Sequence, residues 1–231
     1  MKNQFIKDNL PILILMGITA VGITVTGIVF GQSFLRILPL YISLTIALLQ
    51  SRANRYAPLI GGINSILYCF VYIHYRLYGS AAYAFLVSFP IQIATFIRWS
   101  RNKWGQTTIF RKMTWKQRLL TGAGFVAAVL GLRLVLRLAD ANYVMLDSLT
   151  SLLGILISFL TMFAFIEYSP LMLVSGAISI TLYITMMRDN PEQITYLIFS
   201  FYSMICVSLQ FVRVKKLYAE QQKLAGDTAH G

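Results

Sequence analysis

The stretch "FPIQIATFIRWSRNKWGQ", residues 89–106, decides how this chain is interpreted. Its first half is an apolar run that contains a proline and a glutamine, and its second half is rich in basic residues and tryptophan. An apolar run that ends in Arg and Trp is typical of a transmembrane helix that reaches the lipid headgroups. Gln92 then requires an explanation, because it is a polar side chain inside a segment that lipid surrounds.

The composition of the whole chain also indicates a membrane protein. Of its 231 residues, 57% are hydrophobic and 12% are charged, whereas a soluble domain has about 45–50% apolar and about 25% charged residues. A soluble core of this size cannot hide that excess, so lipid is the expected solvent. Cys69 and Cys206 lie in apolar runs, and together with His74 and His230 they do not form the spacing of a metal site. We therefore expect no metal site and no cofactor.

Eight runs without charged residues predict eight transmembrane helices and an all-α polytopic fold. Most of them reach the roughly 20 residues that a helix needs to cross about 30 Å of hydrocarbon. The second run is short and must extend into its flanks. The runs are 9–35, 37–51, 56–75, 77–97, 119–132, 148–166, 168–187 and 193–212.

Basic residues predict the orientation of these helices. If the N-terminus is cytoplasmic, most of the 20 Lys and Arg residues fall on the cytoplasmic side, and seven of them lie in 98–118, which contains no acidic residue. Only Arg36, Arg76, Arg137 and Arg188 fall on the opposite side. The positive-inside rule then places both termini in the cytoplasm of a multi-pass plasma (inner) membrane protein. The basic stretch contacts anionic lipid headgroups rather than nucleic acid.

A weak internal repeat suggests how the helices are grouped. "YAPL" at 56–59 and "YSPL" at 168–171 each open an apolar helix of similar length. The simplest interpretation is a parallel three-helix unit used twice, joined by a connector helix, with a substrate site at the interface of the repeats. The expected parts are an N-terminal tail and extra helix (1–34), a first repeat (35–99), a basic loop and connector (100–140), a second repeat (141–213) and a cytoplasmic tail (214–231).

Ionisable residues are nearly absent from the predicted spans; Asp147 and Arg133 lie near span ends. This argues against a proton relay or an ion-coupled pump. It also argues against an enzyme, because neither an acid pair nor a nucleophile–base set is available in the membrane. Asp147 is consistent with a ligand contact at the external mouth, and equally with a favourable position in the first turn of its helix.

Neutral polar residues share helix faces, as i, i+4 and i+7 spacing predicts. Amide, hydroxyl and aromatic groups suit a neutral or weakly charged solute that has a flat ring and hydroxyls. Packing between helices is the alternative for the amides, the tyrosines and the serine, and the headgroup belt is the alternative for Trp99. The candidate binding residues are Asn64, Tyr68, Gln92, Trp99, Asp147, Ser179 and Tyr183.

Several of these segments together resemble the Pnu-type vitamin transporters, the PnuC family. The resemblance rests on "GGINSILYCFVYIHYRLYG" (61–79), "FPIQIATFIRW" (89–99), Asp147 in "VMLDSLTSLL", Glu167, "AISITLYI" (177–184) and "YLIF" (196–199), and it covers about residues 40–212. It implies a 3+1+3 helix arrangement similar to the SWEET sugar transporters, with an extra N-terminal helix. It also implies facilitated diffusion of a vitamin precursor, most of all nicotinamide riboside, which a cytoplasmic kinase traps by phosphorylation.

The chain departs from the family pattern at several positions. Ser169 and Met172 stand where the family carries a Trp pair, Gly176 replaces a polar residue, Gln210 replaces a frequent Trp, and Thr95 replaces a common Gly. Thiamine, riboflavin or a deoxynucleoside therefore stay open as substrates. So do a capture subunit of an ATP-driven importer, a membrane enzyme or scaffold, and a homo-oligomeric state.

Overall fold

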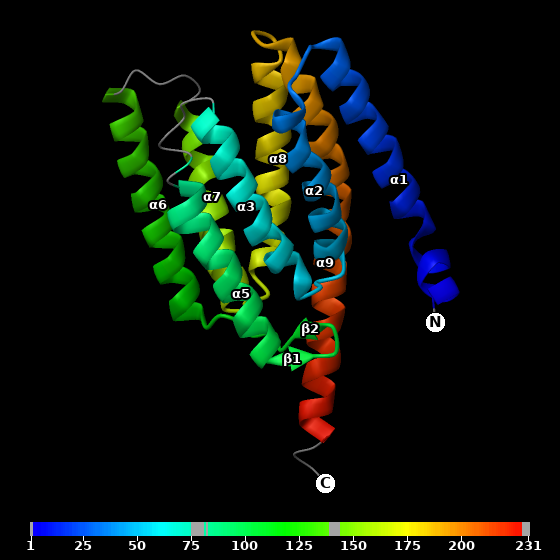
Figure 1. Ribbon diagram of the computed structural model, residues 1–231. Helices are drawn as coiled ribbons and strands as arrows, with labels where there is room; N and C mark the ends of the chain where they lie inside the picture. Colours follow the sequence, from blue (N-terminus) through cyan, green and yellow to red (C-terminus); the bar gives the residue numbers. More distant parts are fainter. Residues whose placement is uncertain (1, 75–80, 82, 139–143, 228–231) are drawn as a thin grey trace.

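The computed structural model describes residues 2–74, 81, 83–138 and 144–227, which form a bundle of eight α-helices (Figure 1). A short π-helical segment, η1 (Ala84–Ser88), runs directly into α5, and a 3-10 turn, η2 (Pro191–Gln193), precedes α9. The helices are α1 (Lys2–Val29), α2 (Phe34–Ser51), α3 (Tyr56–His74), α5 (Phe89–Arg101), α6 (Trp115–Leu138), α7 (Val144–Met162), α8 (Tyr168–Met186) and α9 (Ile194–Asp227).

A small hairpin is the main departure from the expected all-α fold. Strands β1 (Lys103–Trp104) and β2 (Thr107–Thr108) pair antiparallel in the basic loop that follows α5. Gly105 lies between them with φ of 59°, a left-handed conformation that glycine adopts without steric cost. Two-residue strands carry no alternating pattern, so the sequence did not predict them.

The first predicted span, 9–35, is wrong at its C-terminal boundary. The structure ends α1 at Val29 and turns through Gly31, whose φ is +60°. Ser33 then caps α2 by accepting a hydrogen bond from the backbone N–H of Arg36 at 3.4 Å. The second helix is therefore extended at its N-terminus and contains Arg36, which a search for charge-free runs treats as a boundary.

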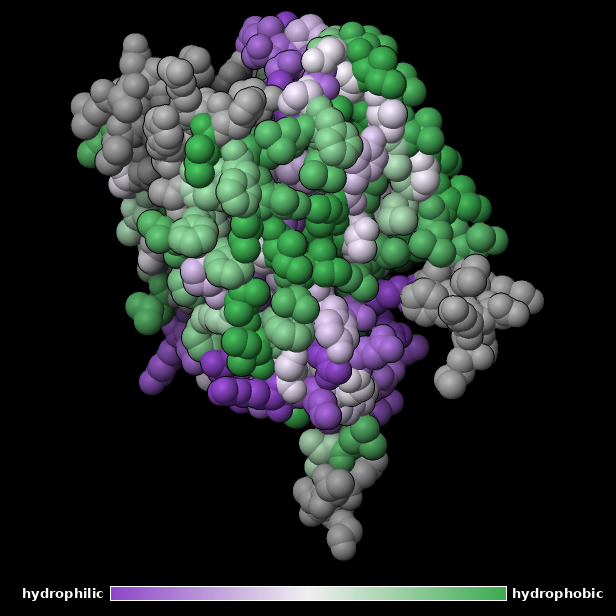
Figure 2. Space-filling view, viewed as in Figure 1, coloured by the Kyte–Doolittle hydropathy of each residue, from purple (hydrophilic) through white to green (hydrophobic). Residues whose placement is uncertain are grey.

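The outer surface of the bundle is apolar over most of its height, as Figure 2 shows for one face. Large hydrophobic side chains on the peripheral helices are open to the surroundings, including Ile28 of α1 (75% exposed) and Leu120 of α6 (77%). Soluble monomers rarely expose apolar patches of this extent. Among the described residues, α1, α2, α8 and α9 are long and apolar enough to cross a membrane, and α3 and α7 contain shorter apolar segments. The fold is that of a multi-pass membrane protein.

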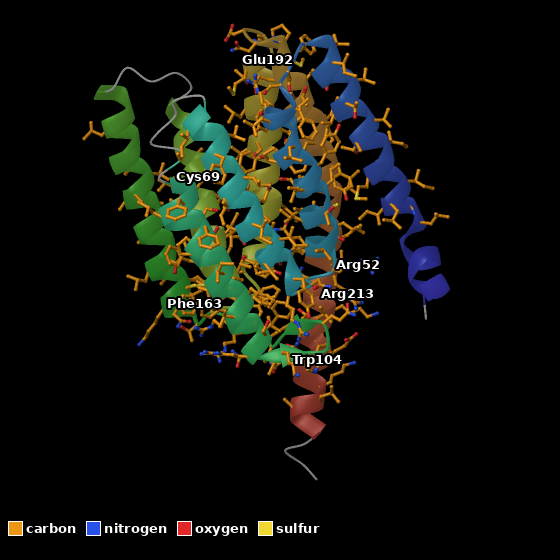
Figure 3. All side chains as sticks on the ribbon, in the orientation of Figure 1. Arg52, Cys69, Trp104, Phe163, Glu192 and Arg213 are labelled. Carbon is orange, nitrogen blue, oxygen red and sulfur yellow. The ribbon has the colours of Figure 1, made fainter. Side chains whose placement is uncertain are left out.

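Basic residues gather at one end of the bundle. Figure 3 places Arg52, Trp104 and Arg213 toward this end, and Glu192 toward the opposite one. The start of α1 and the end of α9 lie toward the same end as the hairpin (Figure 1). The uneven distribution of charge that the sequence shows is therefore a separation between the two ends of the molecule.

The basic loop is folded tightly onto the bundle. Arg111 donates its backbone N–H to the carbonyl of Ala164 at 2.9 Å, and its carbonyl accepts from Ile166 N–H at 2.9 Å. From α9, the amide of Gln221 accepts from Phe110 N–H (2.9 Å) and donates to a carbonyl of β2. These bonds attach the loop between α5 and α6 both to the α7–α8 turn and to α9.

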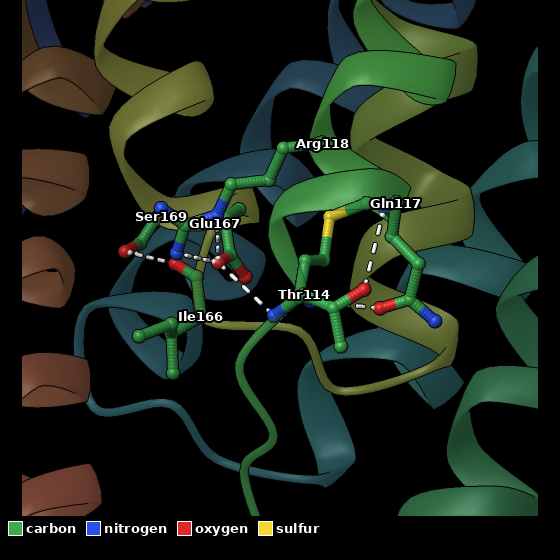
Figure 4. Close-up of polar contacts among 7 residues, drawn as sticks. Thr114, Gln117, Arg118, Ile166, Glu167 and Ser169 are labelled. Atoms are coloured by element: carbon green, nitrogen blue, oxygen red, sulfur yellow. Dashed lines mark hydrogen bonds and ion pairs between the residues drawn. The ribbon is translucent and has the colours of Figure 1, made fainter.

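Glu167 completes this attachment (Figure 4). Its Oε1 accepts from the backbone N–H of Met113 at 3.1 Å and from the Arg118 guanidinium at 2.5 and 3.1 Å. Next to it, Thr114 and Gln117 exchange side chain-to-backbone hydrogen bonds of 3.3 and 2.9 Å, which is the capping box that starts α6. Glu167 therefore serves to join the basic loop to the start of α8.

Asn64 connects α3 to α2. It is 4% exposed, and its Nδ2 donates to the carbonyl of Pro39 (3.2 Å) and to the Ser43 hydroxyl (3.0 Å). Hydrogen bonds of this kind contribute to helix association in lipid, where apolar surfaces gain little by meeting one another.

We expect Asn64→Ala to lower the melting temperature of the purified protein. The substitution removes both bonds to α2, and the expected loss of unfolding free energy is about 1–2 kcal/mol. Ser208→Ala is the control, because that exposed hydroxyl bonds only to the Met204 carbonyl of its own helix. An unchanged melting temperature with lost solute binding would instead show that Asn64 contacts the solute.

Candidate functional site

A cavity of about 70 Å³ lies between two groups of helices. On one side it is bounded by α2, α3 and α5, and on the other by α7, α8 and α9. It lies in the half of the bundle nearer the basic end, because its wall includes the C-terminal turns of α2, α5 and α7 and the first residue of α8. The lining residues are Gln50, Ala53, Asn54, Ala57, Pro58, Ile91, Gln92, Thr95, Trp99, Ile157, Ser158, Thr161, Tyr168, Met172 and Gln210.

The polar groups of this wall are neutral. Four of the lining residues are carboxamides, and Tyr168 and Trp99 add a phenol and an indole. None of the described lining residues is Asp, Glu, Lys, Arg or His. Such a wall offers hydrogen bonds in both directions together with aromatic faces, which suits an uncharged or weakly charged solute with a flat ring.

Trp99 is buried where α5, α7 and α8 meet. Only 2% of it is exposed, and its indole N–H donates to the carbonyl of Thr161 at 2.8 Å. The ring contacts Phe110 edge-on at 5.9 Å, and its centroid lies 6.5 Å from that of Tyr168. The headgroup-belt alternative is therefore wrong for Trp99: its ring faces the protein interior and the cavity.

Gln92 lines the same cavity from α5. Its amide packs over Gly61 of α3 so closely that a Cβ at that position would lie 3.0 Å from Nε2 and 3.1 Å from Oε1. Among the described residues, the amide has no hydrogen-bond partner. Its donors and acceptor are thus available to a solute or to water.

Gln210 lies in the wall on α9, and sequence reasoning did not select it. It is 3% exposed, and its Nε2 donates to the hydroxyl of the fully buried Tyr168 at 3.0 Å. Its Oε1 is buried and has no partner among the described atoms. A signal was present, because Gln210 is a carboxamide deep in an apolar run, as Gln92 is in its own run.

Of the other candidates, Asn64 and Tyr68 lie on α3 outside the described cavity wall. Asn64 bonds to α2, and Tyr68 is half-buried. The structure thus brings Gln92 and Trp99 together at the cavity. It places the Asn64 amide at a helix contact.

The candidates on α7 and α8 also lie away from the cavity wall. Ser179 and Tyr183 are half-buried on α8, and Tyr183 stacks on Tyr196 of α9 with centroids 5.7 Å apart. Asp147 belongs to α7, but its side chain lies outside the described part of the chain, as does that of Arg133. The predicted contact at the external mouth therefore stays a prediction.

The end opposite the basic loop is closed by polar contacts between α2, η2 and α9. Arg36 pairs with Glu192 at 2.9 Å and donates to the Tyr196 hydroxyl at 3.3 Å. Gln32 donates to the Glu192 carbonyl at 2.9 Å.

The cavity is smaller than the roughly 300–1,000 Å³ of ordinary ligand pockets. A solute with a ring and a sugar is larger than this cavity, so the wall must rearrange to admit one.

A multi-helix membrane protein with a neutral polar cavity between two groups of helices has the architecture of a solute transporter. Residues 33–212 match the model of the nicotinamide mononucleotide transporter family, and the chain belongs to this family. It is a membrane transporter and not an enzyme. The resemblance that the sequence motifs indicated is confirmed.

The fold is similar to a solved structure described as the vitamin B3 transporter PnuC. The match has a TM-score of 0.73 and 20% sequence identity, and it covers 91% of each chain. None of the curated proteins matches the chain. The predominantly helical membrane fold is thereby confirmed, with the small hairpin in the basic loop as the exception.

We expect Gly61→Ala to weaken solute binding about five- to tenfold. The added methyl group displaces the Gln92 amide, whose flexible end yields, and the hydrogen bond that this amide gives a solute is worth about 1 kcal/mol. The measurement is the affinity for whichever vitamin or nucleoside raises the melting temperature most. Gly154→Ala is the control, because its methyl group meets no atom within 4 Å. Equal affinities in the two variants would contradict the prediction.

Proposed function

We propose that this transporter mediates facilitated uptake of nicotinamide riboside, a vitamin B3 precursor, across the plasma (inner) membrane. The observation that carries the proposal is the cavity wall of carboxamides, Tyr168 and Trp99 between two helix groups. The aromatic side chains suit a pyridine ring, and the carboxamides suit ribose hydroxyls and an amide. Membership of the family and the similarity to a vitamin B3 transporter support it.

The wall favours the riboside over the mononucleotide. Phosphate groups are bound by Arg, Lys or free backbone N–H groups at helix N-termini, and the described wall contains no cationic side chain. The helix starts beside the cavity are already occupied: Tyr56 N–H donates to the Asn54 side chain, and Tyr168 N–H donates to the Phe165 carbonyl. A phosphate entering this cavity would lose its water without gaining a charged partner.

The proposed transport is downhill. The described lining residues include no carboxylate, histidine, lysine or arginine through which protons are usually coupled, so accumulation depends on what happens to the solute inside the cell. A cytoplasmic kinase that phosphorylates the nucleoside is the proposed functional partner. The basic end faces the cytoplasm in this proposal, together with both termini.

The proposed architecture is a 3+1+3 repeat that crosses the membrane eight times. The first unit is α2, α3 and η1–α5, the second is α7, α8 and α9, α6 connects them, and α1 is extra. Consecutive helices of each unit pack on each other, and α5–α7 and α2–α9 contacts join the units. The cavity between them supports a substrate site at a repeat interface.

Met172 is the reason why other vitamins are tested as competing substrates. It stands at one of the family's Trp positions and lines the cavity, whereas Ser169 at the other is buried and bonds to the Ile166 carbonyl. A thioether replaces an aromatic face there, so the wall accepts rings of other shapes. Thiamine, riboflavin and a deoxynucleoside are therefore the competing solutes in the test.

The test is uptake of labelled solutes into proteoliposomes that contain only this protein. We expect nicotinamide riboside to equilibrate without ATP or an ion gradient, and the mononucleotide to enter at least tenfold more slowly. Enclosing a riboside kinase with ATP converts equilibration into accumulation. Faster uptake of thiamine, riboflavin or a deoxynucleoside would reassign the substrate. Binding without uptake until an ATPase complex is added would favour a capture subunit.

A further inference from the structure

The pair formed by Gln210 and Tyr168 has hydrogen-bonding capacity that the described protein atoms do not use. Gln210 Nε2 donates to the Tyr168 hydroxyl at 3.0 Å, while Gln210 Oε1 is buried and has no partner. Because the Tyr168 oxygen accepts this bond, its own proton is free to be donated, and no acceptor for it occurs among the described residues. One acceptor and one donor thus stand next to each other in the cavity wall.

A buried amide oxygen without a partner is uncommon in folded proteins. Among the described residues Gln32 Oε1 and Asn64 Oδ1 share this property, but neither residue lines the cavity, whereas Gln210 does. Gln210 is 3% exposed and Tyr168 is 0% exposed, so bulk water does not satisfy these atoms. A purely structural position in an apolar helix contact would be filled better by an aliphatic side chain, which has no polar atom to bury. The location of the pair at the cavity instead gives both atoms access to a solute.

The two atoms match one chemical group. A primary carboxamide presents an N–H donor and a carbonyl acceptor side by side, so its N–H pairs with Gln210 Oε1 and its oxygen accepts from the Tyr168 hydroxyl. A carboxylate presents two acceptors and a negative charge, and it would face the Gln210 oxygen without a proton between them. Trp99, whose ring centroid is 6.5 Å from that of Tyr168, supplies an aromatic face beside the group.

We propose that Gln210 and Tyr168 form a carboxamide-recognition subsite that selects nicotinamide-type over nicotinate-type nucleosides. This inference rests on the proposed function, and it adds the residue pair that sets specificity. Gln210 Oε1 accepts from the carboxamide nitrogen of the solute, and the Tyr168 hydroxyl, which accepts from Gln210 Nε2, donates to the carboxamide oxygen. The opposite orientation of the Gln210 amide would expose N–H donors and would favour the acid.

The experiment compares nicotinamide riboside with nicotinic acid riboside, which differ only in having a carboxamide or a carboxylate at the position that the subsite is proposed to bind. Affinities for the purified full-length protein are measured by calorimetry for wild type, Gln210→Met and Tyr168→Phe. We expect wild type to bind the amide at least tenfold more tightly than the acid. Both variants should weaken amide binding and reduce the amide-to-acid ratio toward one. Gln92→Met is the matched control: it should weaken both ribosides and leave the ratio unchanged.

The amide-to-acid affinity ratio can still be interpreted if a variant is destabilised, since both solutes are measured on the same folded fraction. If Gln210→Met does not fold, the subsite is tested by the ratios of Tyr168→Phe and wild type. The subsite is overturned if wild type binds the two ribosides equally or binds the acid more tightly. It is also overturned if Gln210→Met keeps the amide-to-acid affinity ratio of wild type. Proteoliposome uptake distinguishes failure of the subsite from failure of the proposed function. If nicotinamide riboside is taken up but the two ribosides bind equally, the proposed function stands and the subsite does not; if binding is selective but there is no uptake, the subsite stands and the function does not. If neither riboside binds, both proposals are overturned.

Discussion

Hydrogen bonds between helices hold this bundle together, because apolar helix faces gain little by leaving lipid for one another. Asn64 donates from α3 to α2, Trp99 donates from α5 to α7, and the Tyr202 hydroxyl donates from α9 to the Leu44 carbonyl of α2 at 3.2 Å. With no water in the hydrocarbon region, a polar group that lacks such a partner is costly. Among the described residues, three buried amide oxygens have no partner: Gln32 Oε1, Asn64 Oδ1 and Gln210 Oε1. Of these three residues, Gln210 is the one that lines the cavity, together with Gln92.

The two ends of the bundle are held by different contacts. At the basic end, Glu167 accepts hydrogen bonds from the Met113 backbone N–H and from Arg118. An aromatic cluster that includes Trp99 and Tyr168 packs against the basic loop. At the other end, the Arg36–Glu192 pair has side chains that are 25% and 36% exposed. The Arg118–Glu167 pair at the basic end is exposed to a similar degree, at 38% and 18%. Exposed ion pairs contribute about 0–1 kcal/mol, so the ion pairs alone do not make one end of the bundle more stable than the other.

Local features of the sequence were sufficient to predict the membrane fold and the basic end, and to select Gln92, which the structure places in the cavity wall. Charge and hydropathy act over a single helix, so they can be read without knowing its neighbours. The turn at Gly31 was missed because it is uncharged. The partners of Asn64 and Gln210 were missed because Pro39 and Tyr168 lie on other helices, and a single sequence does not report which helix faces pack together. Tyr168 was visible only as part of a repeat motif.

The absence of charge in the wall has two consequences that depend on each other. Under the proposed function, a wall whose described residues include no carboxylate, histidine, lysine or arginine does not couple passage to protons, so the solute equilibrates and must be captured inside the cell. Capture by phosphorylation works only if the phosphorylated product cannot leave by the same route. A wall of amides and aromatic rings, with no Lys or Arg among its described residues, would meet that condition under the proposed function, because it would bind the nucleoside and give its phosphate no charged partner. An arginine in this wall would help the mononucleotide to bind, and would thereby open a path for the trapped product to escape.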